Sequence, residues 1–110
     1  MSIKVKQQEK QFVQLIVENE MTIYTALEQK NALSKYLNTH KEIQIDLSCV
    51  TEIDSAGLQL LLFFKRETEE RSIQFSLIQH SQAVVEVFEL LNIGNHFGDP
   101  IVISANWKKS

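Results

Sequence analysis

The chain has 110 residues, of which 44% are hydrophobic and 23% are charged, and its formal net charge is −3. This length suits one domain with its own core and is too short for two. The acidic balance argues against a nucleic-acid-binding protein, which usually presents a basic surface.

Targeting and redox signals are few. The lysine-rich N-terminus contains no apolar segment of the kind found in signal peptides. The longest uncharged apolar run, around Leu58 to Phe64, falls far short of the roughly 20 residues that span a bilayer. The single cysteine, Cys49, excludes an internal disulfide and fits a reducing compartment. We therefore expect one cytoplasmic domain over residues 1–110, without membrane insertion.

Apolar patterning predicts strands and a helix in the first half of the chain. Ile3–Lys6 is expected as a short edge strand, and Phe12–Val17 as a buried strand rich in β-branched residues. Glu18–Glu20 is expected to end that strand. The apolar stripe from Ile23 to Leu37, which includes Ala26 and Leu27, predicts a helix with Thr22 as its N-cap.

Strands and helices alternate in the second half. Alternating apolar and polar residues predict strands with one better-covered face, and leucine-, valine- and phenylalanine-rich runs predict helices. Because strands joined by helices lie parallel, the order predicts a small mixed α/β sheet of four to five strands whose first pair is antiparallel. The predicted segments are the strands Ile43–Leu47, Ile73–Leu77 and Ile101–Ile103, and the helices Leu58–Phe64 and Ala83–Leu91, the last capped by Ser81 and ended by Gly94.

Residues suited to catalysis or metal binding are sparse. The histidines His40, His80 and His96 are far apart, and none is spaced with another histidine or cysteine as metal ligands are. We expect them on the surface near loops, and we expect Cys49 to be a buried, inert thiol. The chain has no glycine-rich phosphate-binding motif. These observations predict no metal, no cofactor and no enzymatic activity.

The remaining candidate is the turn Asp54–Gly57, which precedes the apolar helix. In one interpretation Asp54 or Ser55 caps the helix, as these residue types often do. In the other, the exposed hydroxyl of Ser55 accepts a phosphoryl group. A phosphate there is stabilised by the helix dipole and by free N–H groups, and it adds a charge of about −1.5 to −2. The residues alone leave both interpretations open.

Several motifs resemble those of a STAS domain, the fold shared by anti-sigma factor antagonists and the cytoplasmic tails of sulfate transporters. The matching segments are Asp46–Ser48, Ile53–Leu58 and Lys65–Arg66, with Thr25–Ala26 upstream and Val84–Gly94 and Phe97 downstream. The resemblance implies a noncatalytic switch in which Ser55 is phosphorylated by a partner serine kinase of the histidine-kinase-like ATPase superfamily. It also implies that the unphosphorylated form binds this partner and releases its client, and that Gly57 permits close approach of a partner backbone.

Two positions depart from the antagonist pattern. Ala56 stands where many antagonists have a second hydroxyl residue, which leaves Ser55 as the single acceptor candidate. Thr22 ends the stretch Asn19–Thr22, where many antagonists have Gly-Glu-Leu-Asp, so the rim of the site is less acidic. The chain is more similar to stand-alone STAS proteins encoded beside bacterial chemotaxis genes, which implies a chemotaxis signalling protein as an alternative partner to a kinase or anti-sigma factor.

Two other hypotheses stay open. One is a constitutive STAS subunit of a larger assembly, such as a lipid-transport ABC complex, with the Asp54–Gly57 turn as its docking surface. The other is nucleotide binding by the domain itself. In the switch and the subunit hypotheses the docking face is the same, and Leu58, Leu61 and Leu62 are expected in the core. The predicted partner-binding residues are Asp54, Ser55, Ala56, Gly57, Gln59, Thr22 and Tyr24, with Thr51 and Glu52 as further exposed candidates.

Overall fold

The computed structural model of the chain describes residues 3–90. The predicted helix end at Gly94, the predicted strand Ile101–Ile103 and His96 lie outside this range. In chain order the elements are β1 (Ile3–Gln8), β2 (Phe12–Val17), β3 (Asn19–Met21), α1 (Ala26–Ser34), the 3₁₀ helix η1 (Lys35–Asn38), β4 (Glu42–Asp46), β5 (Val50–Ile53), α2 (Ser55–Glu70), β6 (Gln74–Ile78) and α3 (Gln82–Leu90).

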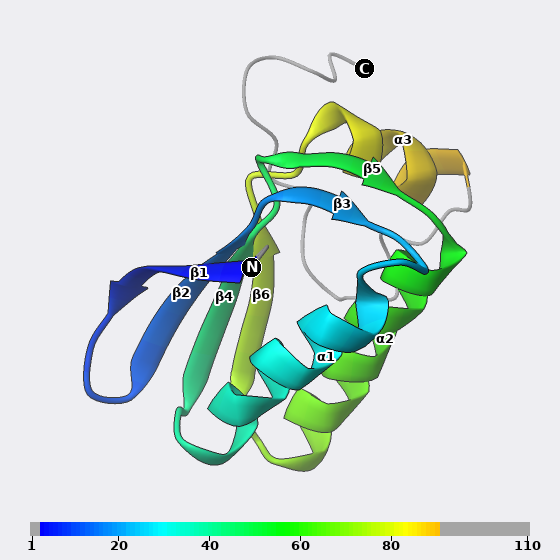
Figure 1. Cartoon of the computed structure of the whole chain (residues 1–110). Coiled ribbons are helices and arrows are strands. Elements are labelled where there is room, and N and C mark those ends of the chain that lie inside the picture. Colours follow the sequence, from blue (N-terminus) through cyan, green and yellow to red (C-terminus); the bar gives the residue numbers. More distant parts are fainter. Residues whose placement is uncertain (1–2, 91–110) are drawn as a thin grey trace.

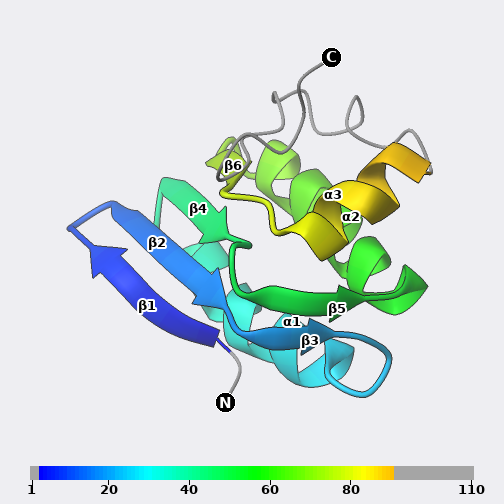
Figure 2. The ribbon, with the colours of Figure 1, turned by 90° about the horizontal axis from the view of Figure 1, so that it is seen from above.

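Four strands form the main sheet in the order β1-β2-β4-β6, and β3 pairs with β5 in a separate two-stranded sheet. Strand β1 is antiparallel to β2, whereas β2, β4 and β6 are parallel neighbours. Figure 1 shows α1 and α2 side by side on one face of the main sheet. Figure 2 shows the β3–β5 pair extending from the main sheet, with α3 next to β5. The predicted mixed α/β sheet with an antiparallel first pair is confirmed.

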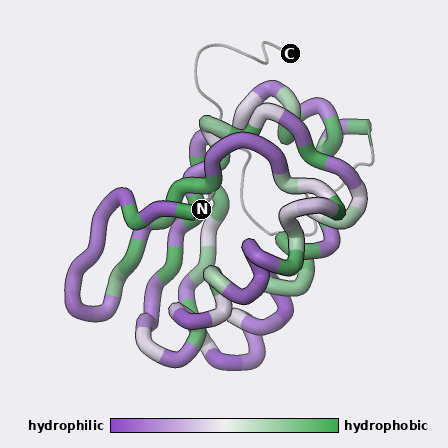
Figure 3. Tube along the Cα trace, in the orientation of Figure 1, coloured by the Kyte–Doolittle hydropathy of each residue, from purple (hydrophilic) through white to green (hydrophobic). Residues whose placement is uncertain are grey.

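The hydrophobic core lies between the main sheet and the two helices on its face. Alternate residues of β2 are fully buried, as expected for a strand with one covered face. Figure 3 shows hydrophobic residues along the strands of the main sheet and mostly hydrophilic residues in the loops at its lower edge. From α2, Leu58 and Leu61 are buried as predicted, and Leu62 is half-buried against this core.

Strands β3 and β5 correct the sequence-based prediction, which ends the second strand at Glu18–Glu20 and assigns no strand to Val50–Ile53. Asn19 has a φ of 71°, a left-handed conformation that asparagine tolerates better than most residues. The chain therefore turns at Asn19 and continues as β3, in which Met21 pairs with Ile53 of β5. Both strands are short and carry exposed polar residues, so the hydropathy pattern does not reveal them.

The first helix begins later than predicted. Thr25, not Thr22, is the N-cap of α1, which starts at Ala26. The carbonyl of Thr22 accepts hydrogen bonds from the amides of Thr25 and Ala26, at 2.9 and 2.8 Å, and closes the turn that precedes α1. The predicted continuous helix to Leu37 is α1 followed by the 3₁₀ helix η1.

The exposure of three side chains differs from the prediction. His40 and His80 are buried, not on the surface. Nδ1 of His40 lies 2.8 Å from the Thr39 hydroxyl, and the ring of His80 meets the ring of Phe88 edge-on at a centroid distance of 5.6 Å. Cys49 is exposed instead of buried, because it lies in the loop between β4 and β5.

Candidate functional site

Asp54 connects the end of β5 to the start of α2. Its backbone is extended, and its Oδ1 accepts hydrogen bonds from the amides of Ala56 at 2.9 Å and Gly57 at 3.1 Å. This is the N-cap role of the first interpretation, now assigned to Asp54. Its second oxygen, Oδ2, accepts a hydrogen bond from the amide of Ile23 at 3.0 Å. One carboxylate therefore caps α2 and holds the turn before α1 against the same point.

The environment of Asp54 favours its charged form. Partial loss of water raises the pKa of the Asp54 carboxyl, but the amides of Ile23, Gly57 and Ala56 lower it by more, and the pKa lies below its usual range. The N-terminus of α2 favours the same negative charge. The side chain is therefore ionised at neutral pH and forms a fixed anionic centre at this end of α2.

Gly57 is needed for the internal packing of the chain, a reason for glycine that the sequence-based interpretation did not include. The residue is buried, and a Cβ added to it would lie 2.1 Å from the carbonyl oxygen of Met21 in β3. That same carbonyl accepts a hydrogen bond from the Asp54 amide at 3.2 Å. Glycine is needed here because α2 and β3 touch backbone to backbone.

Ser55 is the first residue of α2, and its side chain is exposed. Within residues 3–90 its hydroxyl has no hydrogen-bond partner. Ala56 is half-buried, and Gln59, one turn later, is exposed as predicted. The amides of Ala56 and Gly57 already donate to Asp54, so a phosphoryl group on Ser55 would stand beside an ionised carboxylate. The predicted benefit from free N–H groups is correspondingly reduced.

The turn before α1 places its two predicted docking residues differently. Tyr24 is 89% exposed, in agreement with the prediction. Thr22 is only 4% exposed, which contradicts its predicted place on the docking face. Its hydroxyl donates to the Glu20 carboxylate and accepts from the Tyr24 amide at 3.3 Å. Thr22 thus shapes the turn, and its hydroxyl is held by the Glu20 carboxylate.

Sequence reasoning missed an apolar surface next to this turn. Ile23 and Leu27 are each 71% exposed, although Leu27 was assigned to the buried stripe of the first helix. Beside Leu27, a groove of about 300 Å³ runs between α1 and α2 and reaches Ala56 and Gln59. The groove is lined by Ala26, Leu27, Lys30, Ala56, Gln59, Leu60 and Phe63. Ser55 thus lies at one end of an exposed, largely apolar face.

The family model described as "Mlab, STAS domain" matches residues 5–103. The chain belongs to the STAS domain family. The match runs from within β1 through α3 and therefore contains the Asp54–Gly57 turn and the whole of the groove.

Three solved structures share the STAS fold at low sequence identity. A putative anti-sigma factor antagonist from Thermotoga maritima is 23% identical with a TM-score of 0.79, and the match covers 93% of this chain and 86% of that chain. The anti-sigma factor antagonist SpoIIAA in its unphosphorylated form is 17% identical with a TM-score of 0.73, over 94% of this chain and 89% of that one. The Bacillus SpoIIAA in its phosphorylated form is 16% identical with a TM-score of 0.71, over 94% and 92%.

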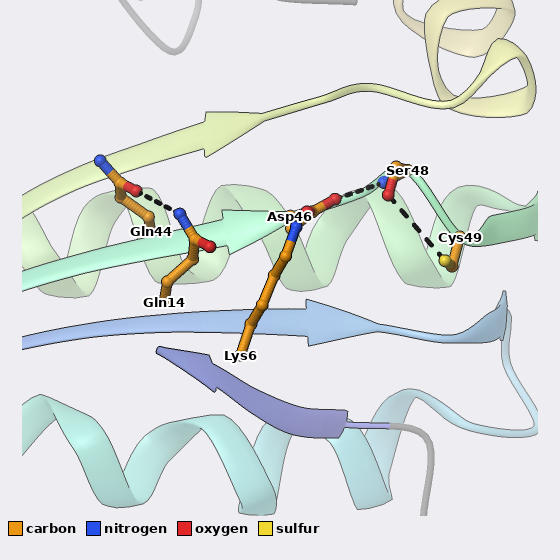
Figure 4. Close-up of polar contacts among 6 residues, drawn as sticks. All are labelled: Lys6, Gln14, Gln44, Asp46, Ser48 and Cys49. Atoms are coloured by element: carbon orange, nitrogen blue, oxygen red, sulfur yellow. Dashed lines mark hydrogen bonds and ion pairs between the residues drawn. The ribbon is translucent and has the colours of Figure 1, made fainter. Parts of the chain in front are cut away.

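A second polar cluster of this STAS domain lies on the main sheet, where Figure 4 shows it. The fully buried carboxylate of Asp46 accepts a hydrogen bond from Nζ of Lys6 at 2.6 Å and another from the Ser48 amide at 2.8 Å. Burial raises the pKa of Asp46, but Lys6 and Ser48 together lower it by more, so this pKa also lies below its usual range. The pair links β1 to β4 across β2.

Two further features of the described range bear on function. Among residues 3–90, no three histidine, cysteine or carboxylate side chains come together as a metal site requires. Within the same range, no helix has both the length and the apolar character needed to cross a bilayer.

Proposed function

We propose that this STAS domain is a noncatalytic regulatory module that binds a partner protein through the face around Ser55 and releases it when Ser55 is phosphorylated. The observation that carries the proposal is the exposed Ser55 hydroxyl at the start of α2, next to a turn that Asp54 holds in place. A kinase can reach this hydroxyl without unfolding the domain. With Ala56 beside it, Ser55 is the one acceptor that we propose at this turn.

The physical basis of the switch is added negative charge on a largely apolar face. Phosphorylation adds a charge of about −1.5 to −2 next to the ionised Asp54. A partner that packs against Ile23, Tyr24 and Leu27 would have to bring its own surface up to this charge and remove its water, which is costly. Unphosphorylated Ser55 is neutral and imposes no such cost.

The proposed partner is a serine kinase with anti-sigma activity or a chemotaxis signalling protein, in the cytoplasm of a bacterium. Structures of SpoIIAA in both its phosphorylated and unphosphorylated forms share the fold of this chain, which supports a phosphorylation-based switch. We also propose that residues 1–110 form a single domain, as the extent of the family match suggests.

Affinity capture from native extract tests the proposal. Wild type, Ser55→Ala and Ser55→Asp are used as baits, and we expect the first two to retain one partner that Ser55→Asp loses. Ser72→Asp is the matched control, because Ser72 is an exposed serine just past the other end of α2, and aspartate tolerates its left-handed φ of 57°. Equal capture by Ser55→Asp and Ser72→Asp would rule out a charge-controlled switch at Ser55.

The exposed apolar face favours a second candidate, a constitutive STAS subunit of a larger assembly such as a lipid-transport ABC complex. Obligate interfaces are more hydrophobic than regulated ones, and Ile23, Tyr24 and Leu27 are all highly exposed. In this case an ATPase co-purifies with the chain, and Ser55→Asp does not dissociate it, whereas Leu27→Glu does.

A further inference from the structure

The apolar lining of the groove between α1 and α2 and the charged side chains at its edge define what fits into it. Leu60 and Ala56 of α2 and Ala26 of α1 give it apolar walls, and Phe63 lies at its far end from Ser55. Leu27 is 71% exposed at its rim. An apolar side chain of a binding partner can therefore bury Leu27 and Phe63 at the same time.

Two cations lie over the Phe63 ring. Nζ of Lys30 is 4.6 Å from the ring centroid, and the Arg66 guanidinium is 5.8 Å from it. Neither forms an ion pair within residues 3–90, whereas the neighbouring Lys65 is paired with Glu69 on the surface of α2. Two unpaired cations at the edge of an apolar groove complement a carboxylate of an incoming segment.

We propose that this groove receives an amphipathic helix of the partner protein, with an apolar side chain seated between Leu27 and Phe63 and an aspartate or glutamate against Lys30 and Arg66. This inference rests on the proposed function, since it names the chemistry of the partner that the Ser55 face binds. The groove reaches Ala56 and Gln59, so a helix seated in it lies directly beside Ser55. A phosphate on Ser55 would then place negative charge at the end of the groove opposite Lys30 and Arg66, and would oppose the binding of an acidic helix.

The same charges favour a protein segment over two other occupants. A second copy of the chain, related by a two-fold axis through the groove, would bring Lys30 and Arg66 against their own equivalents. An anionic membrane surface would meet the carboxylates of Glu20 and Asp54 at the same end of the molecule as Ile23. A narrow partner helix with apolar and acidic residues avoids both repulsions.

Selection from a displayed peptide library tests the inference without knowledge of the partner. The library holds helical peptides of about 18 residues, or five turns, randomised on one face. On the immobilised wild-type chain we expect enrichment of leucine, isoleucine, methionine or phenylalanine at i and i+3 or i+4, with aspartate or glutamate beside them. Enrichment of basic residues, or no enrichment at all, would overturn the proposal.

Variants then locate the bound peptide by fluorescence anisotropy. Leu27→Glu is expected to weaken binding of the best acidic peptide by at least about tenfold, as truncating an interface anchor does. Leu90→Glu, at another highly exposed leucine, in α3, should leave the affinity unchanged. Lys30→Glu is expected to reverse the charge preference, so that a version of the peptide with lysine in place of glutamate binds better. Unchanged affinity in both Leu27→Glu and Lys30→Glu would overturn the groove assignment.

The competing occupants give distinct results. A wild-type dimer in sedimentation that Leu27→Glu converts to monomer would assign the groove to a second copy. Binding to vesicles containing phosphatidylserine, lost in Leu27→Glu, would assign it to a membrane. The groove proposal and the Ser55 switch proposal can also be refuted independently. If only the groove proposal is wrong, Leu27→Glu still captures the partner and Ser55→Asp does not. If only the switch is wrong, Ser55→Asp binds the acidic peptide as tightly as wild type does.

Discussion

Asp46 and Asp54 carry the same side chain at the end of a strand, but their surroundings differ. Asp46 ends β4, is fully buried and pairs with the Lys6 ammonium. Asp54 follows β5, is partly exposed and receives three backbone amides. Both carboxyl pKa values lie below their usual range. The carboxylate that is matched by a cation joins strands of the sheet. The one that is matched by amides holds the turn before α1 at the start of α2 and stays partly exposed.

The largest effect is expected where the Asp54 turn meets β3. Gly57→Ala places a Cβ against the Met21 carbonyl, so the backbone of α2 or β3 must shift, at a cost of about 3 kcal/mol. Urea unfolding measures this loss. Gln59→Ala, on the exposed side of the same helix, is the control and is expected to change the free energy of unfolding by less than about 0.5 kcal/mol. Identical urea midpoints for the two variants would mean that the backbone contact is not essential.

Lys6→Met tests the Asp46 half of the comparison. It leaves a buried carboxylate without its cation, and because Lys6 itself is 49% exposed, we expect a moderate loss of about 2 kcal/mol. Lys4→Met, in the same strand, removes a surface ion pair with Glu18 and should cost about 0.5 kcal/mol or less. Chemical denaturation of both variants makes the comparison, and partner capture by folded Lys6→Met should equal that of wild type. Equal stability losses would show that burial of Asp46 does not matter.

Asp54→Ala should reduce partner capture more than it reduces stability, the opposite of what we expect for Lys6→Met. Loss of the N-cap costs about 1 kcal/mol of stability, which leaves the domain folded. The amide of Ile23 loses its partner as well, so the turn that carries Ile23 and Tyr24 is no longer held against α2, and capture of the partner should fall at least about tenfold. Circular dichroism and affinity capture on one preparation separate the two effects. Wild-type capture by folded Asp54→Ala would remove Asp54 from the docking site.

The smallest effect is on acid stability. Because both carboxyl pKa values are lower in the folded chain, their stabilisation is complete above about pH 5 and is lost as the pH falls through about 4 toward the folded-state values. Thermal melts of wild type should therefore drop between about pH 5 and pH 2, and Asp54→Asn should drop less because one of the two groups no longer titrates. A melting temperature of Asp54→Asn that falls as steeply as that of wild type would argue against the amide cluster as the cause.

Periodicity was sufficient to predict the parts of the fold with regular burial. Glu42–Asp46 is visible in the sequence as apolar alternation, and Phe12–Val17 as a nearly apolar run rich in β-branched residues. The alternation of strands with helices along the chain correctly predicted that these two strands are parallel. Strands β3 and β5 were not predicted, because they are short, partly polar and depend on the left-handed turn at Asn19. Pairing between such segments arises from the tertiary arrangement and leaves no periodic signal.

The candidate site was predictable at Asp54 and Ser55, since a polar turn before a leucine-rich run indicates an exposed helix start. The apolar face was not. Leu27 belongs to the apolar pattern of its helix, but the structure buries Gln29 in the core instead, where its amide donates to the Glu20 carbonyl at 2.9 Å. This rotation of α1 places Gln29 on the inner side and leaves Leu27 facing outward. Hydropathy alone cannot reveal that rotation.

Mass spectrometry of the chain purified from its own cells is the most direct test of phosphorylation at Ser55. Intact mass and peptide mapping report whether a phosphoryl group is present and which residue carries it. We expect a fraction of molecules with a single phosphate on Ser55. A chain that is unmodified under all growth conditions, or that carries its phosphate elsewhere, would contradict it.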